Sequence, residues 1–325
     1  MRLFRHCTEL PDDARGGVVV LGNFDGVHKG HQAVISKGLA LARSLNVPCG
    51  VMTFEPHPRS LFSPDRTPFR LTPLRTKAHI LEALGVDQVF VPHFDEAFAA
   101  IPAEAFVRDI LVGCLGVRHV VIGHDFLFGH KRTGDADVLR RLGAVHGFAV
   151  TALDPVGENH VIFSSTEVRD ALLRGDVKAS SHLLGRYWEV EGRVEHGDAR
   201  GRTIGFPTAN LHLGEYQNPA KGVYAVKAGV DHGEGTKWLD GVANFGNRPT
   251  FDRTGVLLEV HVFDFSGDLY NRHLRVALID FLRAEKKFDG VAALRAQIAE
   301  DAARARIILG DIHLPEEKGP LIPVP

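Results

Sequence analysis

Two histidines with a glycine between them are the first residues of this chain that could do chemistry. The stretch GNFDGVHKGHQ places His28, Gly30 and His31 after the apolar run Val18 to Leu21, where a buried strand would end and a helix begin. Imidazoles at a helix N-terminus bind phosphate oxygens, and glycines such as Gly26 and Gly30 permit close approach. Two surface histidines and turn glycines would produce the same sequence pattern, but its position between a strand and a helix favours a phosphate site.

Two later loops also follow apolar runs and could border the same site. TFEPHP closes the run that begins at Cys49, and GHDFLFG follows the run that begins at Arg118. A proline-stiffened turn would explain the first of these loops equally well. In the second loop, Asp125 could hold a substrate or a backbone amide, whereas Phe126 and Phe128 are expected in the core. Paired with the histidine loop, the two loops are predicted to shape a pocket.

A hydroxyl-rich segment, SSTEVRDALLRGD, begins at Ser164. Ser165 or Thr166 can cap the helix that follows, and Arg169 lies about one turn into it. An ordinary capped helix with a solvated arginine is one explanation. We favour the other, in which the hydroxyls and the guanidinium bind the β- and γ-phosphates of a triphosphate, because the segment closes the same half of the chain.

Oxygen ligands for a metal stand in GRTIGFPTANL, residues 201–211. The overlapping GDARGRT is not a P-loop, which needs GxxxxGK[ST], because it is one residue short and has Arg in place of Lys. Thr208 and Asn210 instead offer a hydroxyl and a carbonyl oxygen two residues apart, both suited to Mg²⁺ beside nucleotide phosphates. Local hydrogen bonds within a turn are the alternative.

An acid interrupts an apolar strand pattern in LLEVHVFDF. Alternation puts Glu259, His261 and Phe263 on one face and the neighbouring leucine and valines on the other. Such a carboxylate is either a charge that protects an edge strand or a general base. Alternation alone favours the edge charge.

These residues need elements that hold them in place, and the first half of the chain predicts an α/β unit. Over residues 17–153, short β-rich runs alternate with helical patterns. That order implies right-handed βαβ units and a parallel sheet covered on both faces. Parallel sheets bind ligands at the carboxyl ends of their strands, so the loops after Leu21, Phe54 and Ile122 are expected at the site.

The second half predicts a β domain. Residues 187–281 carry closely spaced short strands with Gly, Pro and Asn turns, typical of a small barrel or sandwich. A stripe of Val291, Leu294 and Ile298 predicts one closing helix docked on it. The fold class is therefore α/β plus β, with domains expected at 1–182 and 183–310 and a proline-rich, disordered tail at 311–325.

Composition excludes several classes of protein. Lys plus Arg number 38 and Asp plus Glu 40, so the net charge of −2 argues against a nucleic-acid or anionic-membrane binder. The three cysteines form no CxxC pair and suggest neither a disulfide framework nor a zinc site. The longest apolar runs are too short to span a bilayer, and the N-terminus lacks a signal core. We expect a cytoplasmic protein.

The ordered motifs resemble one known family, the bifunctional riboflavin kinase/FMN adenylyltransferases, or prokaryotic FAD synthetases. The motifs are HxGH, TFEPHP, GxDFxFG, SSTxxR, GFPTAN, GVxNFGxRPTF and LExHxFDFxxDLY, spread over about residues 17–301. The resemblance implies a nucleotidylyltransferase α/β module followed by a six-stranded β-barrel kinase module. It also implies Mg²⁺-dependent phosphorylation of riboflavin by ATP, and then adenylylation of FMN to FAD with release of pyrophosphate.

The family's functional residues are carried over only where the motifs match. His28 and His31 resemble the phosphate-binding histidines of the adenylyltransferase, and Glu259 matches the kinase general base. The remaining matches are ligands of ATP, phosphate or Mg²⁺ (Gly26, Gly30, Ser165, Thr166, Arg169, Gly205, Thr208 and Asn210) and pocket or flavin residues (Asp125, Asn244 and Arg248). Two positions depart from the pattern, Leu127 and Tyr187, and Leu127 bears on how tightly the first site holds FMN or ATP.

Three other functions compete with this one. The HxGH motif alone also fits an adenylyltransferase for another acceptor, such as a pantetheine or nicotinamide nucleotide, but the second-domain motifs oppose it. A flavin-binding regulatory protein without turnover would be expected to lack the reactive residues, and all are present. A kinase that has lost adenylyl transfer is the third. The expected partners are the small-molecule substrates, with no nucleic acid or membrane, and oligomerisation is left open.

Overall fold

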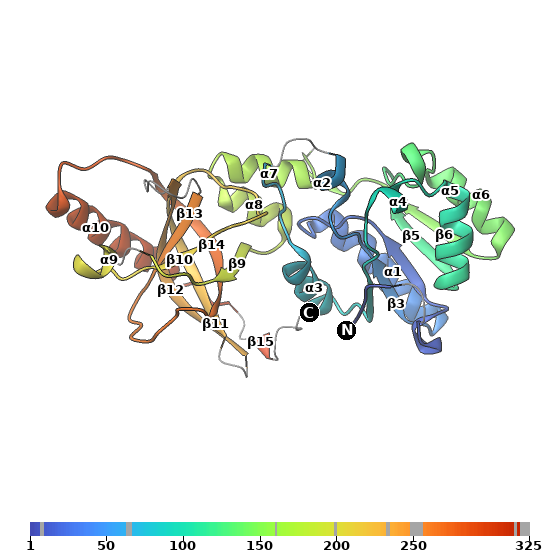
Figure 1. Ribbon diagram of the computed structural model, residues 1–325, viewed down its shortest axis with the longest axis horizontal. Coiled ribbons are helices and arrows are strands. Elements are labelled where there is room, and N and C mark those ends of the chain that lie inside the picture. The colour runs from blue at the N-terminus through green and yellow to red at the C-terminus, as the bar shows by residue number, and fades with distance from the viewer. Residues whose placement is uncertain are drawn as a thin grey trace. The chain divides into compact units, whose positions relative to one another are not determined.

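The computed structural model describes most of the chain, and its contacts form two units (Figure 1). The described residues are 1–6, 10–62, 67–159, 161–197, 200–231, 235–247, 256–314 and 317–318. One unit comprises Met1–Thr67 and Lys77–Ser164, and the other comprises Pro68–Thr76 and Ser165–Pro325. The second unit therefore includes a short segment from the first half of the sequence.

The first unit is built on a six-stranded sheet in which every strand pairing is parallel, as predicted. Its order is β1-β4-β3-β2-β5-β6. The chain builds β2, β3 and β4 in one direction and then returns to the other side of β2, so the direction of winding reverses at β2. The strands are β1 (Arg2–Phe4), β2 (Val18–Leu21), β3 (Cys49–Met52), β4 (Gln88–Phe90), β5 (His119–Gly123) and β6 (Ala149–Leu153).

Every residue of β2 and β3 is buried, which is why these strands are continuous apolar runs in the sequence. Burial also raises the pKa of the Cys49 thiol to about 12. The edge strand β1 was not predicted, because three residues of which none is fully buried carry too little pattern. The helical segments of this unit include α1 (Lys29–Leu45), α2 (Pro58–Phe62), α4 (Glu96–Ala99), α5 (Ala103–Ala105), the π-helix Phe106–Cys114 and α6 (Ala136–His146). Helix α3 (Leu74–Ala83) begins in the second unit and enters this one at Lys77. Strands β7 (Gly157–Glu158) and β8 (Val161–Ile162) pair antiparallel.

The second unit is a curled antiparallel sheet in the order β10-β13-β12-β11-β14-β9. Its ends approach each other at one bridge, where the Glu195 amide donates to the Asn210 carbonyl at 2.9 Å. The strands are β9 (Trp188–Arg193), β10 (Ala209–Leu211), β11 (Gly222–Asp231), β12 (Gly235–Asn247), β13 (Val256–Val262) and β14 (His273–Ala284), with β15 (Glu317–Lys318) on β12. The predicted small β-barrel is thus a curled half-barrel.

Helices accompany this sheet. They are α7 (Ser165–Leu173), α8 (Val177–Leu184), α9 (Arg200–Thr203) and α10 (Val291–Leu309). The predicted closing helix is α10, and Ala305 and Leu309 bury it in a core with Val223 and Ile279. The predicted stripe was wrong at Val291, whose side chain is 63% exposed, because the helix packs through its later turns.

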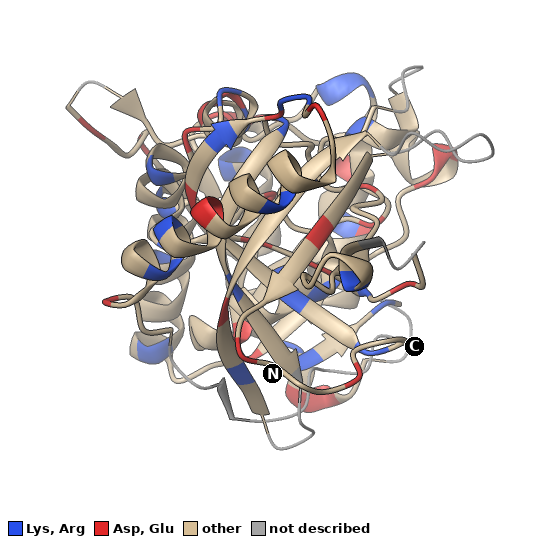
Figure 2. Ribbon diagram, turned by 90° about the vertical axis from the view of Figure 1, so that its left-hand side faces the viewer, with Lys and Arg blue, Asp and Glu red and all other residues tan. Residues whose placement is uncertain are grey.

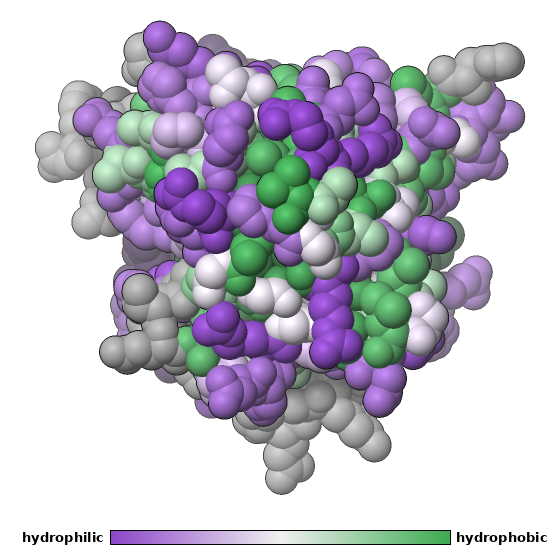
Figure 3. All heavy atoms as spheres, turned by 90° about the vertical axis from the view of Figure 1, so that its right-hand side faces the viewer, coloured by the Kyte–Doolittle hydropathy of each residue, from purple (hydrophilic) through white to green (hydrophobic). Residues whose placement is uncertain are grey.

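The surface matches the near-neutral composition. Figure 2 shows Lys and Arg interspersed with Asp and Glu rather than gathered in one patch. Figure 3 shows hydrophobic patches separated by hydrophilic side chains on the opposite face of the molecule. Among the described residues, no helix is both long and apolar enough to cross a membrane.

Residues 68–76 are held in the second unit by buried polar contacts. Trp188 Nε1 donates to the Leu71 carbonyl at 3.0 Å, and the Thr76 and Tyr216 hydroxyls lie 2.6 Å apart. The Tyr216 hydroxyl also accepts from the Glu191 amide at 3.3 Å. Burial raises the pKa values of both Tyr216 and Glu191. One hydroxyl therefore joins the segment to β9.

Replacing that hydroxyl should destabilise the second unit. Tyr216→Phe leaves the Thr76 hydroxyl and the Glu191 amide short of a partner, so we expect a loss of about 1–3 kcal/mol of unfolding free energy. Urea unfolding followed by tryptophan fluorescence measures it, because both tryptophans, Trp188 and Trp238, lie in this unit. Tyr270→Phe is the matched control, and an equal loss in both variants would contradict the assigned role.

Candidate functional site

The histidine loop leaves the carboxyl end of β2 and leads directly into α1. His28 is the N-cap of that helix, and its Nδ1 accepts from the His31 amide at 3.3 Å. An acceptor at Nδ1 places the proton of the neutral ring on Nε2. The His28 and His31 rings stack with their centroids 3.6 Å apart and their planes at 23°. The loop therefore presents two imidazoles together at the positive end of a helix.

Glycine is required where this loop approaches its neighbours. A Cβ on Gly30 would lie 3.0 Å from the Phe163 carbonyl oxygen and 3.1 Å from the His28 ring. Gly26 has φ +87°, and Phe24 and Val27 also have positive φ angles of 48° and 41°. A β-branched residue rarely adopts such a φ, so the loop is strained beside its reactive side chains.

The two other predicted loops leave the same edge of the sheet, because β3 and β5 flank β2. Phe128 is buried in the core and Phe126 packs against it, as predicted. The Asp125 side chain is 83% exposed, and in this structure its carboxylate lies 3.9 Å from His124 Nδ1. Leu127 is also exposed.

One buried residue at this edge was not predicted. The Lys77 side chain is fully buried, and its Nζ donates to the Asn23 carbonyl at 2.6 Å and to the Thr53 hydroxyl at 2.9 Å. The signal that could have found it is its place on α3, where Leu74, Ala78 and Leu81 make a buried stripe that Lys77 interrupts.

The SSTxxR segment belongs to the other unit. Helix α7 begins at Ser165, so Ser165 and Thr166 are its first residues rather than the residue before it. The Arg169 Nε donates to the Phe69 carbonyl at 2.8 Å, and the guanidinium lies over the Phe69 ring at 5.7 Å. Within its own unit, Arg169 is thus ordered by the segment 68–76.

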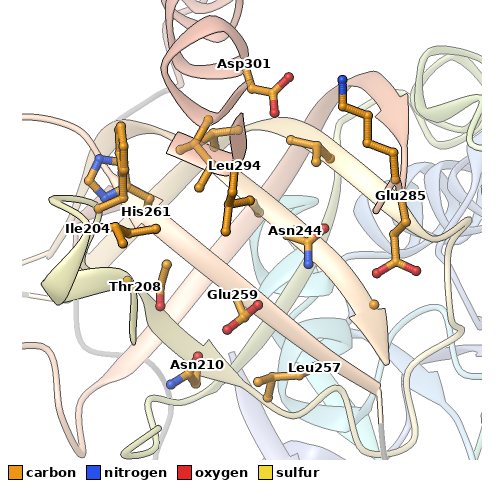
Figure 4. Close-up of a pocket in the computed structure, with 18 of the residues that line it drawn as sticks. Ile204, Thr208, Asn210, Asn244, Leu257, Glu259, His261, Glu285, Leu294 and Asp301 are labelled. Atoms are coloured by element: carbon orange, nitrogen blue, oxygen red, sulfur yellow. The ribbon is translucent and has the colours of Figure 1, made fainter. Parts of the chain in front are cut away.

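A cavity of about 420 Å³ in the second unit contains the predicted acid. Strand β13 pairs with β10 on one side and β12 on the other, so the edge-strand interpretation of Glu259 was wrong. The register places Asn210 opposite Glu259 on one neighbour and Asn244 opposite it on the other. Figure 4 shows these three polar side chains on the floor of the cavity.

The metal-ligand prediction fits this floor. Thr208 and Asn210 both line the cavity, on either side of Ala209. Asn210 is 7% exposed, and its Oδ1 has no hydrogen-bond partner among the described residues. An unpaired buried amide oxygen is costly unless a ligand binds it, and oxygen is the donor Mg²⁺ prefers. The part of the chain that the structure describes holds no cluster of three His, Cys, Asp or Glu for a metal.

The other walls of the cavity carry apolar side chains together with charged ones, among them Glu285 and Lys286. Leu294 and Ile298 of α10 line it, and Asp301 of the same helix pairs with Arg283 at 2.7 Å. The cavity can therefore hold a flat apolar ring with a hydroxylated chain directed at the floor. Arg248, the third predicted pocket residue beside Asn244 and Asp125, lies outside the described residues.

A second cavity, of about 450 Å³, shares Thr208 with the first. Arg202, Pro207, Phe265 and Tyr270 line it. Because one hydroxyl borders both spaces, two ligands bound in them would meet at Thr208. Gly205, on the loop between these walls, has φ +88°, which requires glycine.

Comparisons with known proteins cover both halves of the chain. A family model described as FAD synthetase matches residues 10–167, and one described as riboflavin kinase matches residues 184–309. The bifunctional riboflavin kinase/FMN adenylyltransferase of Escherichia coli strain K12 is 44% identical over 95% of this chain and 98% of its own. The protein of the same name from Pseudomonas fluorescens is 42% identical over 95% of this chain and 98% of its own. A crystal structure titled as a macrolide-efflux protein from Streptococcus pneumoniae is 32% identical, covers 94% of this chain and 98% of its own, and has a TM-score of 0.82.

Proposed function

The chain belongs to the family of bifunctional riboflavin kinase/FMN adenylyltransferases, and we propose that its two candidate sites divide the two reactions between them. The kinase centre is the row of Asn210, Glu259 and Asn244, and the adenylyltransferase centre is the loop carrying His28 and His31. The observation that carries the first assignment is a carboxylate in a central strand, between two amide side chains, on the floor of a cavity.

In the kinase centre, Glu259 acts as general base. The ribityl 5′-hydroxyl of riboflavin is a very weak acid, so a positioned carboxylate that accepts its proton assists attack on the γ-phosphorus of ATP. The new O–P bond forms as the bond from the γ-phosphorus to ADP breaks, which gives FMN and ADP. The apolar wall formed by Leu294 and Ile298 takes the isoalloxazine ring. ATP enters from the second cavity, so that its phosphates reach the flavin hydroxyl beside Thr208.

Thr208 and Asn210 hold Mg²⁺ with the phosphates of ATP. The support is the buried amide oxygen of Asn210, which has no protein partner among the described residues. When bound, Mg²⁺ neutralises charge on the phosphoryl oxygens. The two side chains themselves orient the phosphates toward Glu259 and keep the floor of the cavity polar.

In the adenylyltransferase centre, His28 and His31 stabilise charge on the phosphates of a second ATP. A phosphate oxygen of FMN attacks the α-phosphorus, the new P–O bond forms as the bond to pyrophosphate breaks, and FAD results. The Nε2 proton of His28 and the N-terminus of α1 both favour negative charge here. Ser165, Thr166 and Arg169, which lie in the other unit, are proposed as ligands of ATP phosphates.

We propose that the boundary between the two modules lies near residue 182 of the sequence, with adenylyl transfer in 1–182 and kinase activity in 183–310. The two matched ranges, 10–167 and 184–309, support this boundary. The protein is proposed to act in the cytoplasm on free riboflavin, FMN and ATP, with no nucleic-acid or membrane partner.

Replacing the base should separate the two reactions. Glu259→Gln keeps the size of the side chain but cannot accept the proton, so FMN formation should fall by about 10²- to 10⁴-fold. FAD formation from supplied FMN should remain at the wild-type rate. Chromatographic separation of riboflavin, FMN and FAD over time measures both rates, and a comparable loss of both would contradict the two-site assignment.

Substitution in the histidine loop should have the opposite effect. Gly30→Ala pushes a methyl group against the His28 ring, so FAD formation from FMN should fall by about tenfold or more. FMN formation should not change. Ser36→Ala, on the exposed side of α1, is the control and should alter neither rate. A normal rate of FAD formation in Gly30→Ala would remove this loop from the adenylyltransferase centre.

The metal ligands can be tested by titration. Thr208→Ala should raise the Mg²⁺ concentration needed for half-maximal FMN formation by roughly tenfold, the equivalent of one lost oxygen contact. The magnesium dependence of FAD formation from FMN should stay as it is. An unchanged titration of the first reaction would contradict the role of Thr208.

A further inference from the structure

Lys77 carries a buried charge that neither proposed mechanism uses. Its side chain has no exposed surface, although an ammonium group is costly to remove from water unless strong acceptors surround it. Nζ meets two of them, the Asn23 carbonyl at 2.6 Å and the Thr53 hydroxyl at 2.9 Å. An apolar side chain at this position would avoid the cost of burial, so the charge needs a reason.

The two acceptors belong to the two loops that leave β2 and β3. Asn23 begins the loop that ends at His28, and Thr53 begins TFEPHP. The Thr53 hydroxyl also donates to the Asn23 carbonyl, at 3.0 Å. Three groups thus close a triangle that fixes the start of one loop to the start of the other.

The loop held in this way is the strained one. Between Asn23 and His28, the residues Phe24, Gly26 and Val27 all have positive φ. Its far end is fixed to α1, where the Gln32 amide side chain donates to the Val27 carbonyl at 2.9 Å. A strained loop keeps its shape only when both ends are held, and Lys77 holds the near end.

We propose that Lys77 is a positioning residue of the adenylyltransferase centre, fixing the loop so that His28 stays stacked on His31 at the start of α1. The proposal rests on the function proposed for that loop. Lys77 acts through the Asn23 carbonyl and Thr53 and touches no substrate. Its loss should therefore change the rate of adenylyl transfer through His28, not through an independent contact.

A double-mutant cycle tests this coupling. FAD formation from supplied FMN is measured for the wild type, Lys77→Met, His28→Ala and the double variant, with FMN formation by the same chains as an internal control of folding. Lys77→Met should lower kcat for FAD formation by about a hundredfold, as small misplacements of catalytic groups do, and leave FMN formation within about twofold. In the His28→Ala background, the same change should cost less than about threefold.

Two further variants sharpen the test. Thr53→Val keeps the charge of Lys77 but removes one acceptor, so it should lower kcat for FAD formation less than Lys77→Met does. In the His28→Ala background, Thr53→Val should cause no further loss. It also serves if Lys77→Met does not fold. Lys37→Met, an exposed lysine on α1, should match the wild type.

The possible failures are distinct. Losses that multiply in the double variant, or an equal fall in both reactions, would overturn the positioning role. Wild-type FAD formation in Lys77→Met would do the same while His28→Ala remained defective. If His28→Ala itself formed FAD at the wild-type rate, the function proposed for the loop would fail first.

Discussion

Both candidate centres depend on a strand whose backbone is hydrogen-bonded on both sides. In the first unit β2 lies between β3 and β5, and in the second β13 lies between β10 and β12. Such a strand cannot shift its register without breaking two ladders, so the side chains on it, or directly after it, keep their positions. Glu259 gains its two amide neighbours in this way, and the histidine loop gains its two flanking loops.

Polar groups buried next to these strands serve geometry more than stability. Lys77 and the Asn210 amide would each be replaced by an apolar side chain in a sequence selected for packing alone. The first ties two loops together, and the second leaves an oxygen on the floor of a cavity with no hydrogen-bond partner among the residues that the structure describes. The surrounding core of each unit compensates for this cost.

The sequence allowed the parts of the fold with a local pattern to be predicted. Apolar runs located five of the six parallel strands, and alternation placed Glu259 and His261 on one face. Contacts distant in sequence leave no such pattern. Nothing local indicates that residues 68–76 pack on β9 or that Lys77 bonds to Asn23, since these depend on partners that only the folded chain brings together. Whether Glu259 is an edge-strand charge or a general base also could not be decided locally, because the strands that neighbour β13 are set by the topology of the sheet.

The segment 68–76 makes the second unit discontinuous, and this affects how the chain is made and how it could be divided. Leu71 is synthesised 117 residues before Trp188, and its carbonyl accepts a hydrogen bond from the Trp188 indole. During synthesis on the ribosome, residues 68–76 therefore cannot pack into the second unit until β9 and Tyr216 have emerged. A gene split between Ser164 and Ser165 would deliver the later strands without the residues that bind Trp188 and Glu191. The two units are therefore not separable at a single linker, because nine residues of the second unit, 68–76, lie in sequence between the two segments of the first.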